Sequence, residues 1–98
     1  MSNIRENIFD YFAEREVDDV PILDPEGLDT AIVGVTENQI VYSYEKLVEA
    51  YMNEFREDGM DEEEVEEQAI EWISYNTMRS LPYMGENAPI IMYPLDSF

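Results

Sequence analysis

The 98-residue sequence contains no cysteine and no histidine. The first absence excludes disulfides, thiolate metal sites and cysteine nucleophiles, and the second removes the most common general base. No apolar run approaches the roughly 18 residues that a membrane span requires. Charges interrupt the apolar stretch at the N-terminus, so we expect no signal peptide there. We therefore expect a cytoplasmic protein that does not attach to a membrane.

Positive charge is also scarce. Lys46 and four arginines oppose 24 carboxylates, which gives a formal net charge of −19. Nucleic acids and anionic membranes are bound by clustered cations, so direct binding to either is disfavoured. The charge favours a basic protein partner, with fast and salt-sensitive association. Solubility alone is the competing explanation. Adaptation to high salt is a third, which is disfavoured because glutamate outnumbers aspartate.

The hydrophobic content of 45% is sufficient for one core, so we expect residues 1–98 to form a single domain. Apolar residues at helical spacing predict a helix over about residues 4–15, within an N-terminal segment 1–15. Two prolines deny a continuous helix to residues 16–27, which we interpret as a connector. The core is expected to comprise residues 28–98.

Three strands are expected in this core. Residues rich in β-branched side chains predict a strand at Leu28–Val35, and Ile40–Tyr44 predicts a second strand that completes a hairpin. Gly34 inside the first strand indicates a bulge or a close backbone approach. The apolar run Ile90–Tyr93 lies between two prolines and predicts a third strand at a sheet edge.

Two helices are expected between the hairpin and the third strand. Ser43 can cap a helix over about residues 44–58, and Gly59 is placed to end it in a left-handed conformation. Residues 61–64 read as a capping box for the next helix, which runs to about Met78. The inner face of that helix is expected to contain Val65, Ala69, Trp72, Ile73 and Asn76.

The order helix, β-hairpin, two helices and strand predicts an α+β fold. The helices would pack on a small antiparallel or mixed sheet. A second capping box, at Asn3 and Glu6, would open the N-terminal helix.

The densest charge lies in residues 57–71, EDGMDEEEVEEQAIE, where nine of fifteen residues are carboxylates and none is a cation. Seven of these carboxylates fall between residues 61 and 71, a span of about 16 Å at the rise of an α-helix. The resulting density is roughly one charge per 2.4 Å, between the values of about 1.7 Å for duplex DNA and 3.4 Å for a single strand. A rigid helix of this kind can occupy a groove built for phosphates.

The expected partner-binding residues all lie on this acidic helix. Ile70 is the expected apolar anchor, because an apolar residue ringed by charge is typical of an interface centre. Tyr75 and Tyr83 are weaker candidates for such an anchor, and core packing is the default interpretation of each. The expected contact row is Glu63, Glu64, Glu66, Glu67 and Glu71.

Enzymatic and metal-binding interpretations have little support. Ser43 and Lys46 form an S-x-x-K spacing, but a helix start explains it more simply. The acidic cluster at residues 58–64 lacks the calcium-loop pattern D-x-[DN]-x-[DN]-G, so we expect no specific metal site. We therefore predict a protein that is not an enzyme and that uses no cofactor.

Four segments carry a resemblance to a known family. They are LDTAIVGV (28–35), IVYSYEKLVE (40–49), GMDEEEVEEQAIEWISYNT (59–77) and GENAPIIMY (85–93). In this order they resemble a family of small uncharacterised proteins encoded by bacteriophages, which has no assigned enzymatic function. The chain departs from the family pattern in its more charged helix start, DEEEVEE (61–67). Small phage proteins commonly bind and disable host enzymes, so the resemblance implies a role of that kind.

Together, charge and resemblance predict a phage-encoded inhibitor that acts by DNA mimicry. Its partner would be a basic host protein, such as a nuclease of a CRISPR or restriction system, in the host cytoplasm. The alternative is a non-enzymatic assembly or adaptor protein that binds other proteins through a sheet edge or an aromatic patch. Formation of a homodimer is left open.

Overall fold

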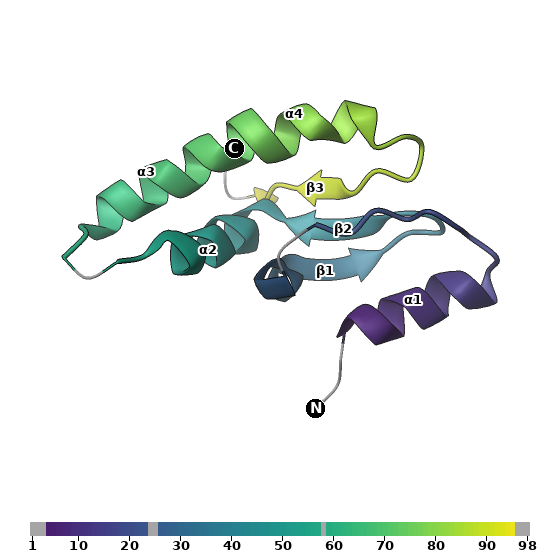
Figure 1. The fold of residues 1–98 in the computed structure, drawn as a ribbon. Coiled ribbons are helices and arrows are strands. Elements are labelled where there is room, and N and C mark those ends of the chain that lie inside the picture. The colour runs from purple at the N-terminus through teal and green to yellow at the C-terminus, as the bar shows by residue number, and fades with distance from the viewer. Residues whose placement is uncertain (1–3, 24–25, 58, 96–98) are drawn as a thin grey trace.

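A three-stranded mixed sheet in the order β1-β2-β3 organises the fold (Figure 1). β1 pairs with β2 antiparallel and β2 pairs with β3 parallel, so β3 lies at an edge as predicted. The α+β class is confirmed, and the sheet is mixed. This computed structural model describes residues 4–23, 26–57 and 59–95. The strands are β1 (Ile32–Val35), β2 (Ile40–Ser43) and β3 (Ile90–Met92).

The first strand begins four residues later than predicted. Residues Glu26–Ala31 form the 3₁₀-helix η1 instead. Leu28 and Ala31 are both completely buried. They lie three residues apart, and the three-residue turn of a 3₁₀-helix places both on one face, whereas a strand separates them to opposite faces. The predicted irregularity at Gly34 is confirmed, because the β1–β2 register shifts between Ile32 and Gly34.

The N-terminal helix α1 (Ile4–Glu14) is confirmed, and it buries Ile8 and Phe12. Its predicted cap residue Asn3 lies outside the described residues. Arg5 ties this helix to the rest of the molecule: its Nε donates to Asp29 Oδ2 at 2.7 Å, and its Nη2 donates to the Leu23 carbonyl at 3.0 Å. The connector is thereby fixed between α1 and η1.

Helix α2 (Tyr44–Phe55) begins where the sequence predicts. The Ser43 hydroxyl accepts the Lys46 backbone N–H at 3.4 Å. The helix ends three residues early, at Phe55, because Arg56 adopts an extended conformation. Gly59 has the expected positive φ, 87°, but it does not end the helix. It lies in the turn before α3, where the Met60 N–H donates to the Glu57 carbonyl.

Helix α3 (Glu62–Trp72) continues without a break through three further helical segments. They are the π-helix η2 (Ile73–Thr77), the short helix α4 (Met78–Ser80) and the 3₁₀-helix η3 (Leu81–Tyr83). Asp61 is the N-cap of α3, but its side chain makes no capping hydrogen bond, so the predicted capping box is wrong.

The inner face of this rod differs from the prediction at two positions. Val65, Ala69 and Ile73 are buried as expected. Trp72 is 46% exposed and Asn76 is also exposed. A π-helix has i→i+5 bonds and more residues per turn than an α-helix. The inner position therefore passes from Asn76 to Thr77, whose hydroxyl lies 3.1 Å from the Tyr51 hydroxyl in a buried hydrogen bond.

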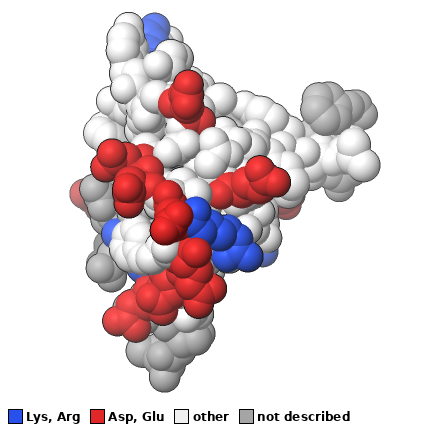
Figure 2. Space-filling model, turned by 90° about the vertical axis from the view of Figure 1, so that its right-hand side faces the viewer, with Lys and Arg blue, Asp and Glu red and all other residues white. Residues whose placement is uncertain are grey.

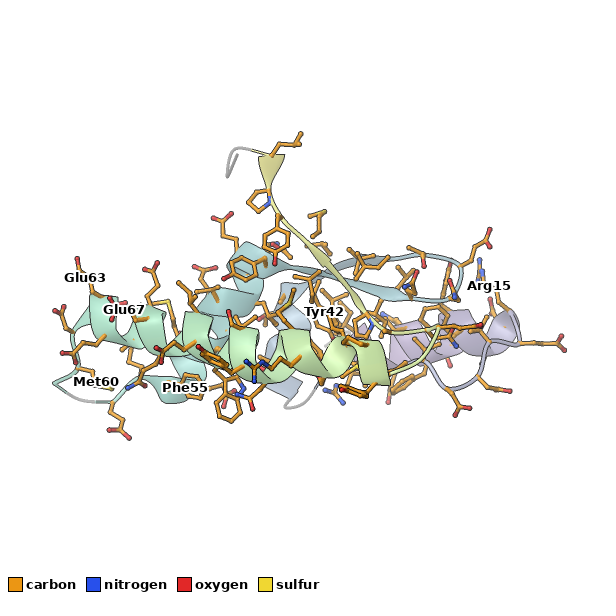
Figure 3. All side chains as sticks on the ribbon, turned by 90° about the horizontal axis from the view of Figure 1, so that it is seen from above. Arg15, Tyr42, Phe55, Met60, Glu63 and Glu67 are labelled. Carbon is orange, nitrogen blue, oxygen red and sulfur yellow. The ribbon has the colours of Figure 1, made fainter. Side chains whose placement is uncertain are left out.

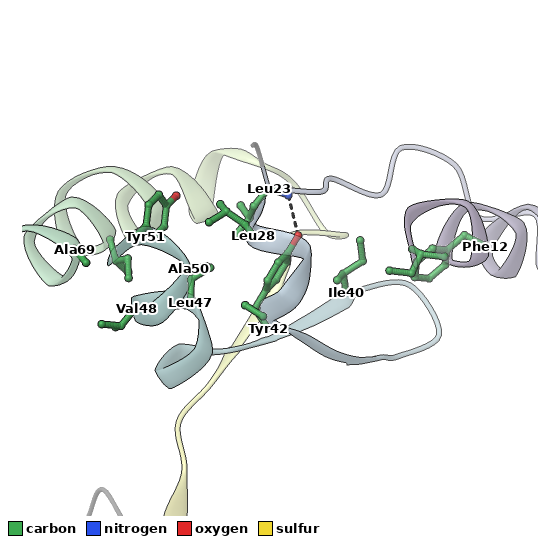
Figure 4. Close-up of a cluster of buried hydrophobic side chains, with 13 residues drawn as sticks. Phe12, Leu23, Leu28, Ile40, Tyr42, Leu47, Val48, Ala50, Tyr51 and Ala69 are labelled. Carbon is green, nitrogen blue, oxygen red and sulfur yellow. Dashed lines mark hydrogen bonds between the residues drawn. The ribbon is translucent and has the colours of Figure 1, made fainter. Parts of the chain in front are cut away.

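The core gathers on one face of β2. Ile40 and Tyr42 are completely buried. Ile40 lies between Tyr42 and Phe12 of α1 (Figure 4). The Tyr42 hydroxyl accepts the Leu23 backbone N–H at 2.9 Å, drawn as the dashed line in Figure 4. Leu28 of η1 completes this centre. The core therefore joins elements from all parts of the described chain.

Candidate protein-binding site

Helices α2 and α3 pack against each other, and the densest run of carboxylates in the sequence extends from the turn between them into α3. Ala69 of α3 is fully buried, and Ala50 of α2 is nearly so. Burial of Ala69 shows which side of α3 faces the core. Apolar residues occupy the contact, so the carboxylates of both helices remain outside. The first turns of α3 carry the exposed residues Asp61, Glu62, Glu63, Glu64, Glu66 and Glu67.

The structure places the six expected contact residues on different sides of α3. Glu63 and Glu67 lie along one edge of the helix, and Phe55 of α2 lies at the opposite edge (Figure 3). Glu66 and Ile70 line a groove shared with α2. Glu71 lines a second hollow, which contains Phe55. Glu64 is exposed and lines neither.

The groove shared by α2 and α3, here called the acidic groove, has an apolar floor and a carboxylate rim. Its volume is about 300 Å³. Ile70 is 36% exposed and belongs to the floor, so it does not project freely from the outer face. Glu45, Glu49 and Glu66 supply the rim. The floor is completed by Tyr44, Val48, Met52, Ile70 and Pro94.

The electrostatics of the acidic groove are one-sided. Among the described residues that line it, three are glutamates and none is a cation. Glu45 and Glu49 are one turn apart on α2, where like charges oppose helix stability by a few tenths of a kcal/mol. Arg56 pairs with Glu62 at 3.1 Å, but both side chains are well exposed, so solvent screens this pair.

Tyr44 connects the groove to the C-terminal strand. Its ring lies 4.8 Å from the ring of Tyr93, measured between centroids. Burial, and then the neighbouring Tyr93, raise the pKa of Tyr44 above its ordinary value. The phenol is therefore neutral at physiological pH, and the charge of the groove comes from its glutamates.

Carboxylates are not confined to helices α2 and α3. Figure 2 shows the face at the right of Figure 1, where several acidic groups surround a strip of Lys or Arg side chains. Glu14, Glu37 and Glu86 are exposed examples outside α2 and α3. Net charge alone therefore does not single out a site. The acidic groove is distinguished by the combination of an apolar floor with a carboxylate rim.

Metal and membrane functions gain no support from the structure. In the described ranges, no group of three or more Asp or Glu side chains is arranged to hold a metal ion. The helices described there include none long and apolar enough to cross a membrane. Ser43 is largely buried and caps α2, as the simpler interpretation of its spacing from Lys46 predicts.

Sequence reasoning missed the second hollow, here called the aromatic hollow. It is about 350 Å³ in volume. Phe55, one of its lining residues, lies at the edge of α3 opposite Glu63 and Glu67 (Figure 3). Tyr75, assigned to the core, is 60% exposed, and Tyr83 is 90% exposed. The default placement of both tyrosines in the core was therefore wrong. The lining residues are Phe55, Gln68, Glu71, Trp72, Tyr75 and Asn76.

Comparisons with known proteins leave these two surfaces as the guide to function. The chain matches no protein-family model, no curated protein and no solved structure.

Proposed function

We propose that this protein is a non-enzymatic inhibitor that binds a basic surface of a nucleic-acid-binding enzyme and displaces its nucleic acid. The acidic groove carries the proposal. The resemblance to phage proteins favours a host defence nuclease, of CRISPR or restriction type, as the enzyme. The inhibitor would then act in the cytoplasm of the host cell.

The chemistry of the acidic groove suits lysine and arginine side chains. Their aliphatic stems cover apolar surface while the charged ends stay near water. Val48, Met52 and Ile70 offer the apolar contact, and Glu45, Glu49 and Glu66 stand where the charged ends would lie. A surface that binds phosphates is rich in the same cations. Such a surface cannot hold this protein and nucleic acid at once.

The exposed carboxylates beside the groove extend the same surface. Glu63 and Glu67 follow each other by one turn on α3 (Figure 3). Charges of one sign around an interface raise the association rate and make it sensitive to salt. With a net charge of −19, the whole molecule contributes to this attraction. The groove then supplies the contact that selects the partner.

The adaptor alternative through a sheet edge has less support. β1 has four residues and β3 has three, and the pairing of β1 with β2 shifts register between Ile32 and Gly34. Short edge strands and bulges are features that protect sheets against strand addition.

Two variants of equal charge test the proposal. Glu45→Gln/Glu49→Gln/Glu66→Gln removes the rim of the groove. Glu14→Gln/Glu37→Gln/Glu86→Gln removes three exposed carboxylates elsewhere. The assay is the displacement of a fluorescent DNA duplex from purified restriction and CRISPR nucleases, followed by anisotropy at low and high salt. Wild type and the distant variant should displace the duplex at similar concentrations.

The groove variant should require about tenfold more protein, since three partly screened pairs at about 0.5 kcal/mol each amount to that factor. Equal losses in the two variants would show that net charge, and not the groove, drives binding. Binding that leaves the duplex in place would contradict inhibition by competition.

A further inference from the structure

The aromatic hollow exposes the rings of two large aromatic side chains. Trp72 is 46% exposed and Tyr75 is 60% exposed, and both line the hollow. Phe55 meets Trp72 edge to face, with 5.7 Å between ring centroids. Phe55 also stacks on the buried Tyr51 at 5.7 Å. The hollow is therefore a ring surface anchored to the core, and exposed Trp and Tyr are enriched at the centres of protein interfaces.

The π-helix positions these groups. Because the inner position passes to Thr77, Asn76 turns outward beside Trp72 and Tyr75. The Asn76 amide donates to the Trp72 carbonyl at 3.2 Å, one of the bonds that fix this segment. π-helical turns are rare and occur frequently at functional sites. Here the turn brings two rings and one amide to the same hollow.

The charge of the side chains that line the hollow favours a cation. Glu71 lines it, and the described residues that line it include no Lys or Arg. Close by, the Arg79 guanidinium carbon lies 4.8 Å from the centroid of the Tyr75 ring. This ring therefore already carries an internal cation, and an incoming guanidinium has to use the ring surface of Trp72 and Tyr75 that remains exposed. Trp is the best partner for a cation over an aromatic face, and a planar guanidinium stacks on rings while it pairs with carboxylates.

We propose that the aromatic hollow binds an arginine side chain of the basic partner protein. The guanidinium would stack on Trp72 and Tyr75 and pair with Glu71. This inference rests on the proposed function in taking a basic protein as the partner. A volume of about 350 Å³ is sufficient for one side chain, not for a folded segment.

Trp72 allows a direct test, because it is the only tryptophan in the chain and it lines the hollow. The probes are hexa-arginine and hexa-lysine peptides with blocked termini, titrated while Trp72 fluorescence is recorded. Hexa-arginine should change the emission in a saturable way and bind about fivefold more tightly than hexa-lysine, since stacking adds about 1 kcal/mol.

Matched variants assign the binding to the hollow. Tyr75→Ala and Glu71→Gln should each weaken hexa-arginine binding about three- to fivefold. The controls Tyr83→Ala and Glu86→Gln remove an exposed ring and an exposed carboxylate outside the hollow and should change nothing. Thermal unfolding of each variant verifies that it is folded; Tyr75→Phe, which keeps the ring, should bind like wild type.

The inference is overturned if the hollow variants bind hexa-arginine like the controls, or if the two peptides bind equally. It also fails if hexa-arginine binding is weakened only by the groove substitutions Glu45→Gln/Glu49→Gln/Glu66→Gln and not by the hollow substitutions. That result leaves the proposed function standing. Conversely, Tyr75-dependent arginine binding without displacement of DNA from any nuclease would remove the proposed function and keep the hollow as an arginine site.

Discussion

The buried hydroxyl of Tyr42 gives a sharp test of the core. Tyr42 is completely buried, and its hydroxyl accepts the Leu23 backbone N–H at 2.9 Å. Tyr42→Phe keeps the ring and leaves this donor without its acceptor. An unsatisfied buried donor costs about 1–3 kcal/mol. The lost oxygen is small, so we expect a decrease of about 1–2 kcal/mol in the free energy of unfolding at pH 7.

The same hydroxyl makes the difference in unfolding free energy between wild type and Tyr42→Phe depend on pH. Burial is the main cause that raises the pKa of Tyr42 from 10.0 to about 12. The folded protein therefore holds the proton more strongly than the unfolded chain. This contribution to stability is fully present below pH 10 and is lost as the pH rises through about 12. Two pKa units correspond to about 2.7 kcal/mol when the loss is complete. The Phe variant lacks this loss.

The assay is urea unfolding of wild type and Tyr42→Phe, followed by Trp72 fluorescence at pH 7, 9, 11 and 12. The advantage of wild type should be constant from pH 7 to 9 and should shrink at pH 11 and above. The other tyrosines titrate in both proteins and cancel from the difference. Tyr83→Phe, at a site that is 90% exposed, is the control and should match wild type throughout. Equal stability of Tyr42→Phe and wild type at pH 7, or a difference that stays constant to pH 12, would refute the reasoning.

Two further substitutions test the connections between elements by the same unfolding measurement. Asp29→Ala removes the carboxylate that holds Arg5 at 2.7 Å in a largely buried pair, and we expect a loss of about 2 kcal/mol; a loss below about 0.5 kcal/mol would mean that the pair does not anchor α1. Gly59→Ala places a side chain on a residue with φ 87°, and no atom lies within 4 Å of the added carbon. Backbone strain alone should therefore lower the free energy of unfolding by about 1–2 kcal/mol. Gly34→Ala is its control, because Gly34 has the same open space without a positive φ, and a Gly59 variant no less stable than this control would contradict the explanation.

The local elements of this protein were readable from the sequence. The period of apolar residues determined α1 and α2, and Ser43 marked the start of α2. Proline on both sides of Ile90–Ile91–Met92 indicated an edge strand. In each case the signal lies within a few residues, and neighbouring side chains agree on one conformation. The α+β class followed from the order of these elements.

The candidate surfaces depended on tertiary packing. Whether Leu28 belongs to a strand or to η1 was decided by α2, which packs on that turn. The exchange of Asn76 for Thr77 at the inner position was decided by the π-helix and by Tyr51, 26 residues earlier in the chain. A sequence period cannot show such an insertion, because no local residue marks it.

The acidic stretch shows the same division. The sequence determined that residues 61–67 form a densely charged helix, since charge and helical period are local properties. Only the packing of α3 on α2 decided which flank each carboxylate occupies. It set Glu66 and Ile70 in the acidic groove and Glu71 in the aromatic hollow. The sequence thus determines the number of charges, while the packing of α2 and α3 against a common core determines the surfaces on which they lie.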